Sequence, residues 1–465
     1  MTYPETTRYL ESFINYEKIP AYPYKESLKL ERIKIFLAAI DNPQNTLKCI
    51  HVAGTKGKGS TCAFVAYILR AAGYKVGLYT SPHLSDFRER IRVLNRKSEA
   101  TLRLCSGRVN QQPQKDFEGM ISKNELTGLV EKLKPAIEKY NKNSKYGPLS
   151  FFEVYTILAF IYFKEKKVDF AVLETGLGGR LDATNVVQPL VAAITPISYE
   201  HTQILGNTLR EIATEKAGII KTANLTVISA PQEEEAAKVI RNRSKKAGAR
   251  LYEVGRDIKY QKTEDKFSVK GIFGEYPDLK IRLLGSHQLV NATVAVGIVE
   301  ALRFYDFNVD AASIRKGLNN TIWPGRCEVI QQDPLVVLDG AQNIASSRAL
   351  KKAIRENFLC SGSASGRGSG GKYKKLILVI GISSDKDLKG ICAQLYGLAD
   401  EIVLTKANNP RATPPEILAG YFKGKKVYIT NNVKEAREKT KAIAKKKDLI
   451  LVTGSLFVAG EFRNA

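Results

Sequence analysis

The sequence predicts an α/β protein built around a parallel sheet. Short apolar runs alternate with helical stretches along most of the 465 residues, and the first run leads straight into a glycine-rich turn that opens a helix. Strands separated by helices are joined by crossovers, which produce parallel, doubly wound sheets. A chain of this length exceeds one typical hydrophobic core, so we expect two domains.

The first set of alternating elements lies between residues 48 and 304. We expect strands at residues 48–53, 75–80, 168–174, 190–195 and 225–230, and helices at residues 61–72, 233–247 and 288–304. Before the last helix, residues 252–284 alternate apolar and polar side chains around Gly271, Gly274 and Pro277. This period of two, interrupted by turn-forming residues, predicts a small antiparallel ribbon.

A second set of alternating elements begins near residue 335. We expect strands at residues 335–339, 376–381, 402–405, 425–430 and 448–453, with helices at residues 344–358 and 433–446. Residues 321–325 separate the two sets and are interpreted as a hinge. We therefore predict a larger domain over residues 1–320 and a smaller α/β domain over residues 321–465.

Two segments do not resemble packed structure. Residues 360–371 are a low-complexity run of Gly and Ser, typical of a flexible surface loop, and the wider insertion extends to residue 373. Residues 98–122 carry Gln, Asn and Lys with little apolar periodicity. We interpret both as loop insertions, and the sequence leaves their roles open.

The glycine-rich turn at residues 54–60 predicts a phosphate-binding loop. Its three glycines allow backbone N–H groups to surround an anion, Lys58 adds a point charge, and the following helix directs its positive end at the same place. A nucleoside triphosphate is therefore the expected ligand. The match to the general P-loop is incomplete, because Val52 stands where the first glycine is usual and Gly59 where Ser or Thr follows the lysine.

The net charge of +25 invites nucleic acid, an anionic membrane surface or anionic small molecules as partners. Lys and Arg recur in short clusters along the whole chain, without one basic arm and without an aromatic-interleaved RNA motif. We therefore expect small anionic substrates, with neither nucleic acid nor membrane as a partner. A monomer is expected as well.

Apolar stretches stay below membrane-spanning length, and the first residues lack the pattern of a signal peptide, so a cytoplasmic protein is expected. The cysteines contain no C-x-x-C pair, which argues against a disulfide framework or a structural zinc site. We expect all six to be reduced: Cys49, Cys62, Cys105, Cys327, Cys360 and Cys392.

Three polar side chains, Ser81, Glu174 and His201, lie at or beyond the ends of three of the predicted strands. An open α/β sheet gathers its ligand-binding groups at these carboxyl ends. Together with phosphate oxygens and water, the three residues would complete an octahedral Mg²⁺ shell. Histidine is an unusual magnesium ligand, so Mn²⁺ or a polar structural role for His201 stays open. For His51 and His287 we favour packing or hydrogen bonding.

These motifs resemble those of the folylpolyglutamate synthase/dihydrofolate synthase family, a member of the Mur ligase superfamily. The resemblance covers nearly the whole chain in nine segments that keep the family's order. They are residues 54–60, 80–84 with 88–93, 150–153, 173–185, 215–219, 291–292, 323–326, 339–343 and 453–457. The resemblance implies an N-terminal P-loop ATPase domain of Mur ligase type with a parallel sheet, and a smaller C-terminal Rossmann-like α/β domain.

The activity that the resemblance implies is ATP-dependent amide formation. A folate or dihydropteroate carboxylate takes the γ-phosphoryl group of ATP, and the amine of L-glutamate then displaces phosphate. No protein nucleophile is required, since catalysis comes from orienting the reactants and neutralising phosphoryl charge. The order of preference between dihydropteroate and reduced folates, and the length of any glutamate tail, stay open.

The resemblance also implies roles for individual residues. Lys58, His201 and Lys216 would act in catalysis. The ATP-binding residues would be Gly57, Lys58, Gly59, Ser60, Asn291, Arg326 and Asp339. Mg²⁺ would be bound at two sites by Ser81, Glu174, His201 and Lys216, the last as a carbamate. Without the resemblance, a lysine on a helix at position 216 is interpreted as a surface side chain.

Substrate contacts follow from the same resemblance. The pterin-side pocket would be lined by Ser150, Phe151, Phe152, Glu153, Leu181, Asp182 and Ala183. Gln342 and Ser455 match candidate contacts to the incoming glutamate. Gln342 replaces the usual histidine of the family, Lys56 replaces an asparagine, and Glu200 replaces an aspartate. The replacement at Gln342 leaves the identity of the amino-acid acceptor open.

Other classes of function have different sequence requirements. A cell-wall Mur ligase would carry a nucleotide-sugar domain before its P-loop, and the turn at Gly54 leaves no room for it. A motor or switch NTPase would need a Walker-B Asp and a glutamine or arginine finger. A nucleic-acid-binding protein would bind in a steeply salt-dependent way. A related amide ligase with another carboxylate substrate or amino-acid acceptor remains the alternative.

Overall fold

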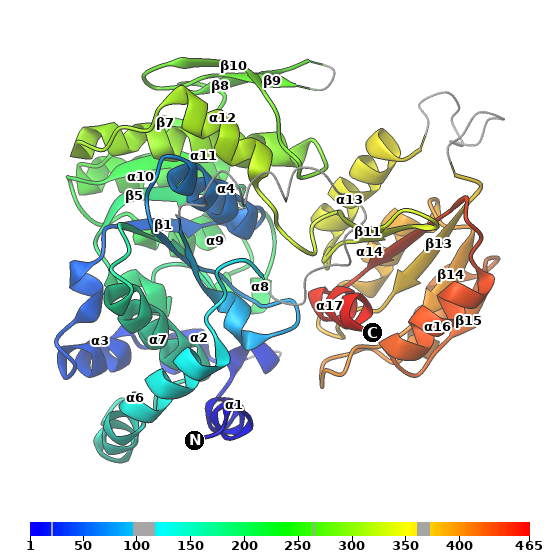
Figure 1. The fold of residues 1–465 in the computed structure, drawn as a ribbon, viewed down its shortest axis with the longest axis horizontal. Coiled ribbons are helices and arrows are strands. Elements are labelled where there is room, and N and C mark those ends of the chain that lie inside the picture. Colours follow the sequence, from blue (N-terminus) through cyan, green and yellow to red (C-terminus); the bar gives the residue numbers. More distant parts are fainter. Residues whose placement is uncertain (20–21, 96–116, 264–265, 360–372) are drawn as a thin grey trace.

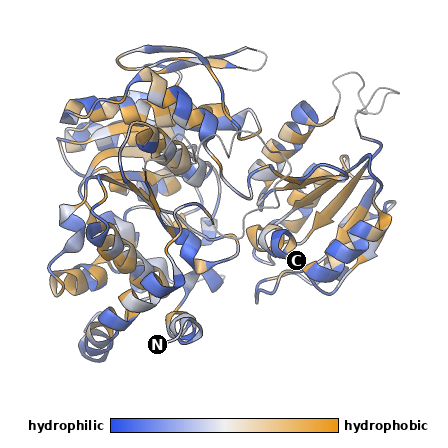
Figure 2. Cartoon of the chain, viewed as in Figure 1, coloured by the Kyte–Doolittle hydropathy of each residue, from blue (hydrophilic) through white to orange (hydrophobic). Residues whose placement is uncertain are grey.

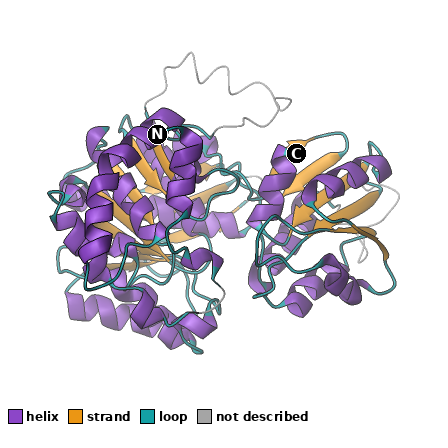
Figure 3. Ribbon diagram, turned by 90° about the horizontal axis from the view of Figure 1, so that it is seen from below, coloured by secondary structure: helices purple, strands orange, loops and turns teal. Residues whose placement is uncertain are grey.

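The computed structural model describes residues 1–19, 22–95, 117–263, 266–359 and 373–465. The described strands form a seven-stranded sheet, a three-stranded sheet and a six-stranded sheet. Figure 1 shows the first two in a larger part of the molecule and the third in a smaller part that carries the C-terminus. Helices enclose the strands of both parts (Figure 3). The predicted α/β fold class is confirmed.

The seven-stranded sheet has the order β3-β2-β4-β1-β5-β6-β7, with all neighbours parallel except β2 and β3. Five of its strands match the predicted ones. The two outer strands, β3 and β7, were not predicted. Strand β7 is partly exposed and lacks a continuous apolar run, whereas β3 is buried at every position. The strands are β1 Cys49–Ala53, β2 Val76–Tyr79, β3 Ile91–Leu94, β4 Phe170–Glu174, β5 Pro189–Ile194, β6 Thr226–Ser229 and β7 Arg250–Glu253.

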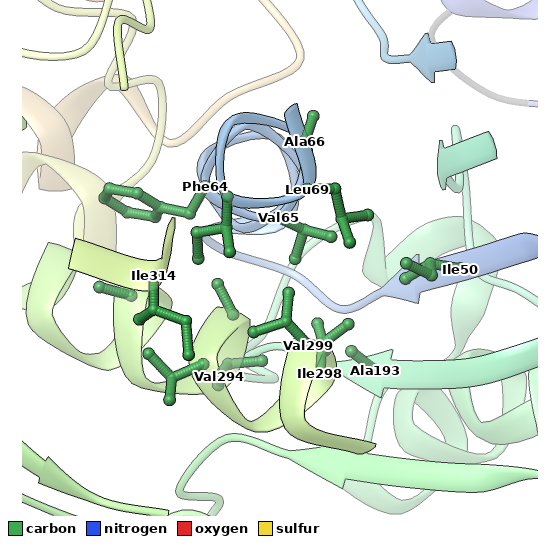
Figure 4. Close-up of a cluster of buried hydrophobic side chains, with 14 of the residues drawn as sticks. Ile50, Phe64, Val65, Ala66, Leu69, Ala193, Val294, Ile298, Val299 and Ile314 are labelled. Atoms are coloured by element: carbon green, nitrogen blue, oxygen red, sulfur yellow. The ribbon is translucent and has the colours of Figure 1, made fainter. Parts of the chain in front are cut away.

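The core of the larger part forms where three helices pack on one face of this sheet. Figure 4 shows Phe64, Val65 and Leu69 of α4 facing Val294, Ile298 and Val299 of α11, with Ile314 of α12, Ile50 of β1 and Ala193 of β5 around them. The expected helix at residues 61–72 begins earlier, because Gly57 in left-handed conformation lets the helix begin at Lys58. The three helices are α4 Lys58–Ala71, α11 His287–Ala301 and α12 Ala311–Asn320.

The other helices of this part cover the opposite face and the edge. A second apolar cluster joins residues of α1, α3, α6 and α7. These helices are α1 Tyr3–Glu11, α2 Tyr24–Ser27, α3 Leu30–Ala38, α6 Lys123–Asn143, α7 Phe151–Glu165, α8 Thr202–Leu205, α9 Leu209–Lys216 and α10 Glu234–Ala247.

The predicted antiparallel ribbon is confirmed, and its strands are β8 Lys259–Lys262, β9 Phe267–Lys270 and β10 Glu275–Leu279. Phe267, Val269 and Tyr276 pack on the core that holds α11. The start of the predicted ribbon segment instead belongs to β7 of the large sheet.

The six-stranded sheet has the order β11-β12-β16-β13-β14-β15, with β11 antiparallel to β12 and the others parallel. Its strands are β11 Glu328–Gln331, β12 Leu335–Leu338, β13 Lys375–Ile380, β14 Glu401–Leu404, β15 Lys426–Ile429 and β16 Asp448–Thr453. Its helices are α13 Ile344–Asn357, α14 Leu388–Tyr396, α15 Pro415–Ala419, α16 Val433–Ile443 and α17 Leu456–Asn464. Figure 2 shows hydrophobic strands between helices with hydrophilic outer faces.

The two predicted insertions fall largely outside the described residues, since residues 96–116 and 360–372 are not described. The end of the first insertion is packed rather than looped out: Arg70 forms an ion pair with Glu118, and Met120 pairs with Arg92 as an isolated bridge. The domain boundary after residue 320 stays a prediction, although α12 ends at Asn320.

Four of the six cysteines, Cys49, Cys62, Cys327 and Cys392, are described, and all four are buried free thiols. Cys105 and Cys360 lie outside the described residues. Within the described ranges, no helix is long and apolar enough to cross a membrane.

Candidate active site

Two adjoining pockets hold most of the predicted site residues. The first, called here the loop pocket, is lined by the turn at residues 55–60, by the ends of β2 and β4, and by residues 339–346 from the smaller part. The second, called the apolar pocket, is lined by the start of α7, by residues 181–183 and by side chains from the N-terminal segment, among them Tyr16, Tyr22 and Ile33. Ser81, Pro82, Gly176, His201, Gln342 and Leu456 line both.

The glycine-rich turn is shaped by close packing at Gly57. Its φ is +83°, and a Cβ at this position would lie 2.1 Å from Asn291 Oδ1. The backbone N–H groups of Thr55 and Lys56 both donate to Pro196 O at 3.1 Å. The turn is therefore held open against β5, with the N-terminus of α4 directed into the loop pocket, as a phosphate cradle requires.

Ser81, Glu174 and His201 come together at the wall of the loop pocket. Glu174 Oε2 accepts a hydrogen bond from Ser81 N at 3.1 Å, and burial raises the pKa of this carboxyl. Burial lowers the pKa of His201 to about 4, so its ring is neutral near pH 7 and keeps a lone pair for a metal. A nearby cation would offset the burial of Glu174, so the donor set fits Mg²⁺.

Metal binding by this set would need help from a ligand. Over the described ranges, no group of three or more His, Cys, Asp and Glu side chains is arranged to hold a metal ion. Glu174 and His201 supply only two such groups, and Ser81 adds a hydroxyl. Phosphate oxygens and water would have to complete the shell, in keeping with the sequence-based expectation.

Lys216 is buried, so its interpretation as a surface lysine was wrong. It is the last residue of α9, and its Nζ donates to Gly54 O at 2.8 Å, directly behind the glycine-rich turn. Burial, together with the nearby charge of Lys58, lowers its pKa to about 7. Much of the amine is therefore uncharged near neutral pH, which is the form that reacts with CO₂.

The smaller part supplies Arg326 and Asp339 to the loop pocket. The Asp339 carboxylate accepts hydrogen bonds from Cys327 N at 2.9 Å and from Ala341 N at 2.8 Å, and burial raises its pKa. It thereby shapes the backbone that leads to Gln342. Asn291 lines the same pocket from α11 and donates to Gln288 Oε1 at 2.9 Å.

Most predicted substrate residues line the apolar pocket, and two do not. The lining includes Ser150, Phe152, Glu153, Leu181, Asp182, Ala183 and Gln342. Phe151 instead packs against Phe87 and Tyr155 in the core, because consecutive helical residues point about 100° apart. Ser455 is buried as the N-cap of α17, its Oγ accepting from Phe457 N at 3.1 Å, and it lines neither of the two pockets.

Two of the four carboxylates that line the apolar pocket, Glu153 and Asp182, were predicted from the sequence, and both already have partners. Glu153 accepts from Arg32 Nε at 2.8 Å and from Ser150 Oγ at 2.7 Å. Asp182 accepts from Leu177 N at 2.9 Å. Both carboxylates are thus held in place, and the remaining lining is largely aromatic and aliphatic, which suits a flat heterocyclic ring.

Several lining residues escaped the sequence reasoning. Tyr16, Tyr22 and Ile33 precede the glycine-rich turn, while Lys386 and Arg411 come from the smaller part. The concentration of Tyr at residues 16–24 was the available signal for the first group. His51, for which hydrogen bonding was favoured, is buried with Nε2 at 2.8 Å from Thr184 Oγ1, and that prediction is confirmed.

Comparison with known proteins shows to which family this chain belongs. Residues 125–299 match the Mur ligase middle domain, and residues 325–456 match the Mur ligase glutamate ligase domain. The chain is 34% identical over 444 residues to the dihydrofolate synthase/folylpolyglutamate synthase of Bacillus subtilis, covering 93% of this chain and 94% of that protein. The chain belongs to the dihydrofolate synthase/folylpolyglutamate synthase family. The Escherichia coli member is 30% identical over 431 residues, covering 92% of this chain and 89% of that protein.

Solved structures of the family share the fold over the whole chain. Folylpolyglutamate synthase of Mycobacterium tuberculosis, complexed with ADP, superposes with a TM-score of 0.83 at 29% identity, covering 99% of this chain and 97% of that one. FolC of E. coli, in complex with DHPP and ADP, gives 0.78 at 28%, covering 100% and 97%. The six-stranded sheet, β11 to β16, corresponds to the glutamate ligase domain of the superfamily.

Proposed function

We propose that this chain is an ATP-dependent ligase that joins L-glutamate to the carboxylate of a folate or of dihydropteroate. The observation that carries the proposal is that the loop pocket and the apolar pocket meet, sharing Ser81, His201 and Gln342 in their walls. A triphosphate cradled at Lys58 and a heterocycle against Phe152 would bring the γ-phosphorus and the substrate carboxylate together at this junction.

The reaction needs no protein nucleophile. A carboxylate oxygen attacks the γ-phosphorus of ATP, forming an acyl phosphate as ADP leaves. The glutamate amine then attacks the acyl carbon, the amide bond forms, and inorganic phosphate departs. The backbone N–H groups of the turn and the Lys58 ammonium stabilise the charge that develops on the phosphoryl group.

Ser81, Glu174 and His201 would hold Mg²⁺, which neutralises phosphoryl charge when bound. Lys216 as a carbamate would supply an anionic oxygen for a second metal. The pKa of about 7 and the position behind the turn support this modification. Neutral His201 leaves the first site without an additional repelling cation.

The smaller part contributes the acceptor side of the site. Gln342 reaches both pockets, and Ser455 caps α17 close by in sequence to Leu456 and Phe457, which line the apolar pocket. We assign Gln342 to the incoming glutamate, with residues 321–325 as the hinge between domains 1–320 and 321–465. A cytoplasmic monomer remains the expectation.

Phosphate release in the presence of ATP, Mg²⁺ and L-glutamate tests the function. Dihydropteroate and tetrahydrofolate are supplied in separate reactions, and the products are identified by mass spectrometry. Release that requires glutamate and one of the two pterin substrates supports the proposal. Because Gln342 replaces the family's histidine, other amino acids are tested in parallel. Ligation of another amino acid in preference to glutamate would favour the alternative amide ligase.

A further inference from the structure

The carboxylate of Glu200 joins the larger and the smaller part of the molecule. Its Oε1 accepts a hydrogen bond from Lys56 Nζ, in the glycine-rich turn, at 2.9 Å. The same oxygen accepts from Asn343 Nδ2 at 2.7 Å. Asn343 is the N-cap of α13, and its Oδ1 accepts from Ser346 N at 2.9 Å. One oxygen therefore connects the turn to the N-cap of a helix that packs on the six-stranded sheet.

Lys56 is surrounded by like charges, because Lys58 and Lys386 lie near it. A second lysine in the turn therefore requires a counterion, and Glu200 supplies it at 2.9 Å. Lys56 and Glu200 thus act as one charge pair.

The residues beside this pair are those of the proposed reaction centre. His201 follows Glu200 in a left-handed conformation with φ +53°, and Gln342 precedes Asn343. The loop that carries Glu200 is further tied to the turn, since Ser198 N donates to Thr55 Oγ1 at 3.1 Å. The hydrogen bond from Asn343 to Glu200 therefore joins the chain neighbours of Gln342 and His201, which both line the two pockets.

We propose that Glu200 is a positioning residue, which fastens the smaller part of the molecule to the phosphate-binding turn through Lys56 on one side and Asn343 on the other. The proposal rests on the proposed function, because that function supplies the substrates. The contacts of Glu200 themselves bear on nucleotide binding between the two parts. Lys56 acts as the counterion that keeps Glu200 in place, rather than as a phosphate ligand.

A double-mutant cycle tests the proposal. Lys56→Gln and Glu200→Gln remove the charges at nearly constant side-chain volume, and Asn343→Ser keeps an N-cap while removing the amide donor. Affinity for the ATP analogue AMPPCP with Mg²⁺ is measured by calorimetry, and dimensions with and without it by small-angle scattering. We expect each single variant to weaken AMPPCP binding about tenfold, and Lys56 and Glu200 to show a coupling factor of about fivefold. Compaction on binding should be reduced in Glu200→Gln and Asn343→Ser.

Lys375→Gln and Glu401→Gln are the matched controls. Lys375 and Glu401 form an ion pair at 3.0 Å with side-chain exposures of 23% and 15%, close to the 27% and 14% of Lys56 and Glu200, but away from both pockets. Their variants should change the melting temperature without changing AMPPCP affinity. Multiplicative effects of Lys56→Gln and Glu200→Gln would overturn the proposal, as would equal losses in the controls. Failure of the unaltered protein to bind AMPPCP would instead refute the proposed function.

Discussion

Gly57→Ala should both destabilise the protein and distort the phosphate-binding turn. The added Cβ would meet two separate penalties. First, Gly57 has φ +83°, where an alanine is strained by about 1–2 kcal/mol. Second, its Cβ would lie 2.1 Å from Asn291 Oδ1. Overpacking of this kind costs about 1–3 kcal/mol. The free energy of unfolding should therefore fall by about 2–5 kcal/mol.

Gly73→Ala separates the two penalties. Gly73 has φ +97°, and a Cβ there would meet no atom within 4 Å. The free energy of unfolding of this control variant should fall only by the conformational penalty, about 1–2 kcal/mol. The double variant Gly57→Ala/Asn291→Ala removes the atoms that clash, so its stability should recover toward that of Gly73→Ala.

Urea denaturation followed by circular dichroism measures the free energy of unfolding, and titration with AMPPCP measures the affinity for nucleotide. Gly57→Ala should bind the nucleotide at least about tenfold more weakly, because the turn must shift to relieve the contact. The double variant should stay weak, because Asn291 is itself a proposed ATP contact. Equal destabilisation by Gly57→Ala and Gly73→Ala, or unchanged nucleotide affinity in Gly57→Ala, would refute this account of the turn.

Four further predictions concern single residues. Lys58→Ala should keep the fold and lower kcat/KM for ligation by at least about 100-fold, since it removes the positive charge that faces the phosphates. Near-normal turnover would contradict the assignment of the turn as a phosphate-binding loop. Glu174→Ala and His201→Ala should each raise the Mg²⁺ concentration for half-maximal activity by at least about tenfold, and a titration that matches the parent would remove the metal assignment. Lys216 should give a carbamate signal in ¹³C NMR with labelled bicarbonate; active enzyme with an unmodified ammonium rules this out. Asp339→Ala should weaken ATP binding about tenfold, because the hydrogen bond that Ala341 N donates to this carboxylate is lost. Unchanged affinity would show that Asp339 does not contribute to nucleotide binding.

Local patterns were enough to predict the central strands and the glycine-rich turn. The strand at Cys49–Ala53 and the turn after it are formed by consecutive residues. Their apolar side chains and their glycines therefore determine both structures locally. Strand β16 was predicted at its observed bounds, because a buried parallel strand reads as an uninterrupted apolar run. Outer strands such as β11 lack that run and were missed.

The grouping of Ser81, Glu174 and His201 was also predictable, because the carboxyl ends of neighbouring parallel strands must meet at one edge of the sheet. The direction of individual side chains was not. Phe151 and Phe152 are chemically identical neighbours, yet only Phe152 reaches the apolar pocket. Which of them faces the core depends on how α7 packs.

Lys216 and Glu200 mark the limit of sequence reasoning here. A lysine at the end of a helix is ordinarily solvated, and only the packing of α9 behind the turn buries Lys216 against Gly54 O. Glu200 bonds to Lys56 and Asn343, each more than a hundred positions away along the chain. Strands and turns arise from preferences of adjacent residues, whereas burial and pairing arise from contacts that exist only after distant segments have packed together.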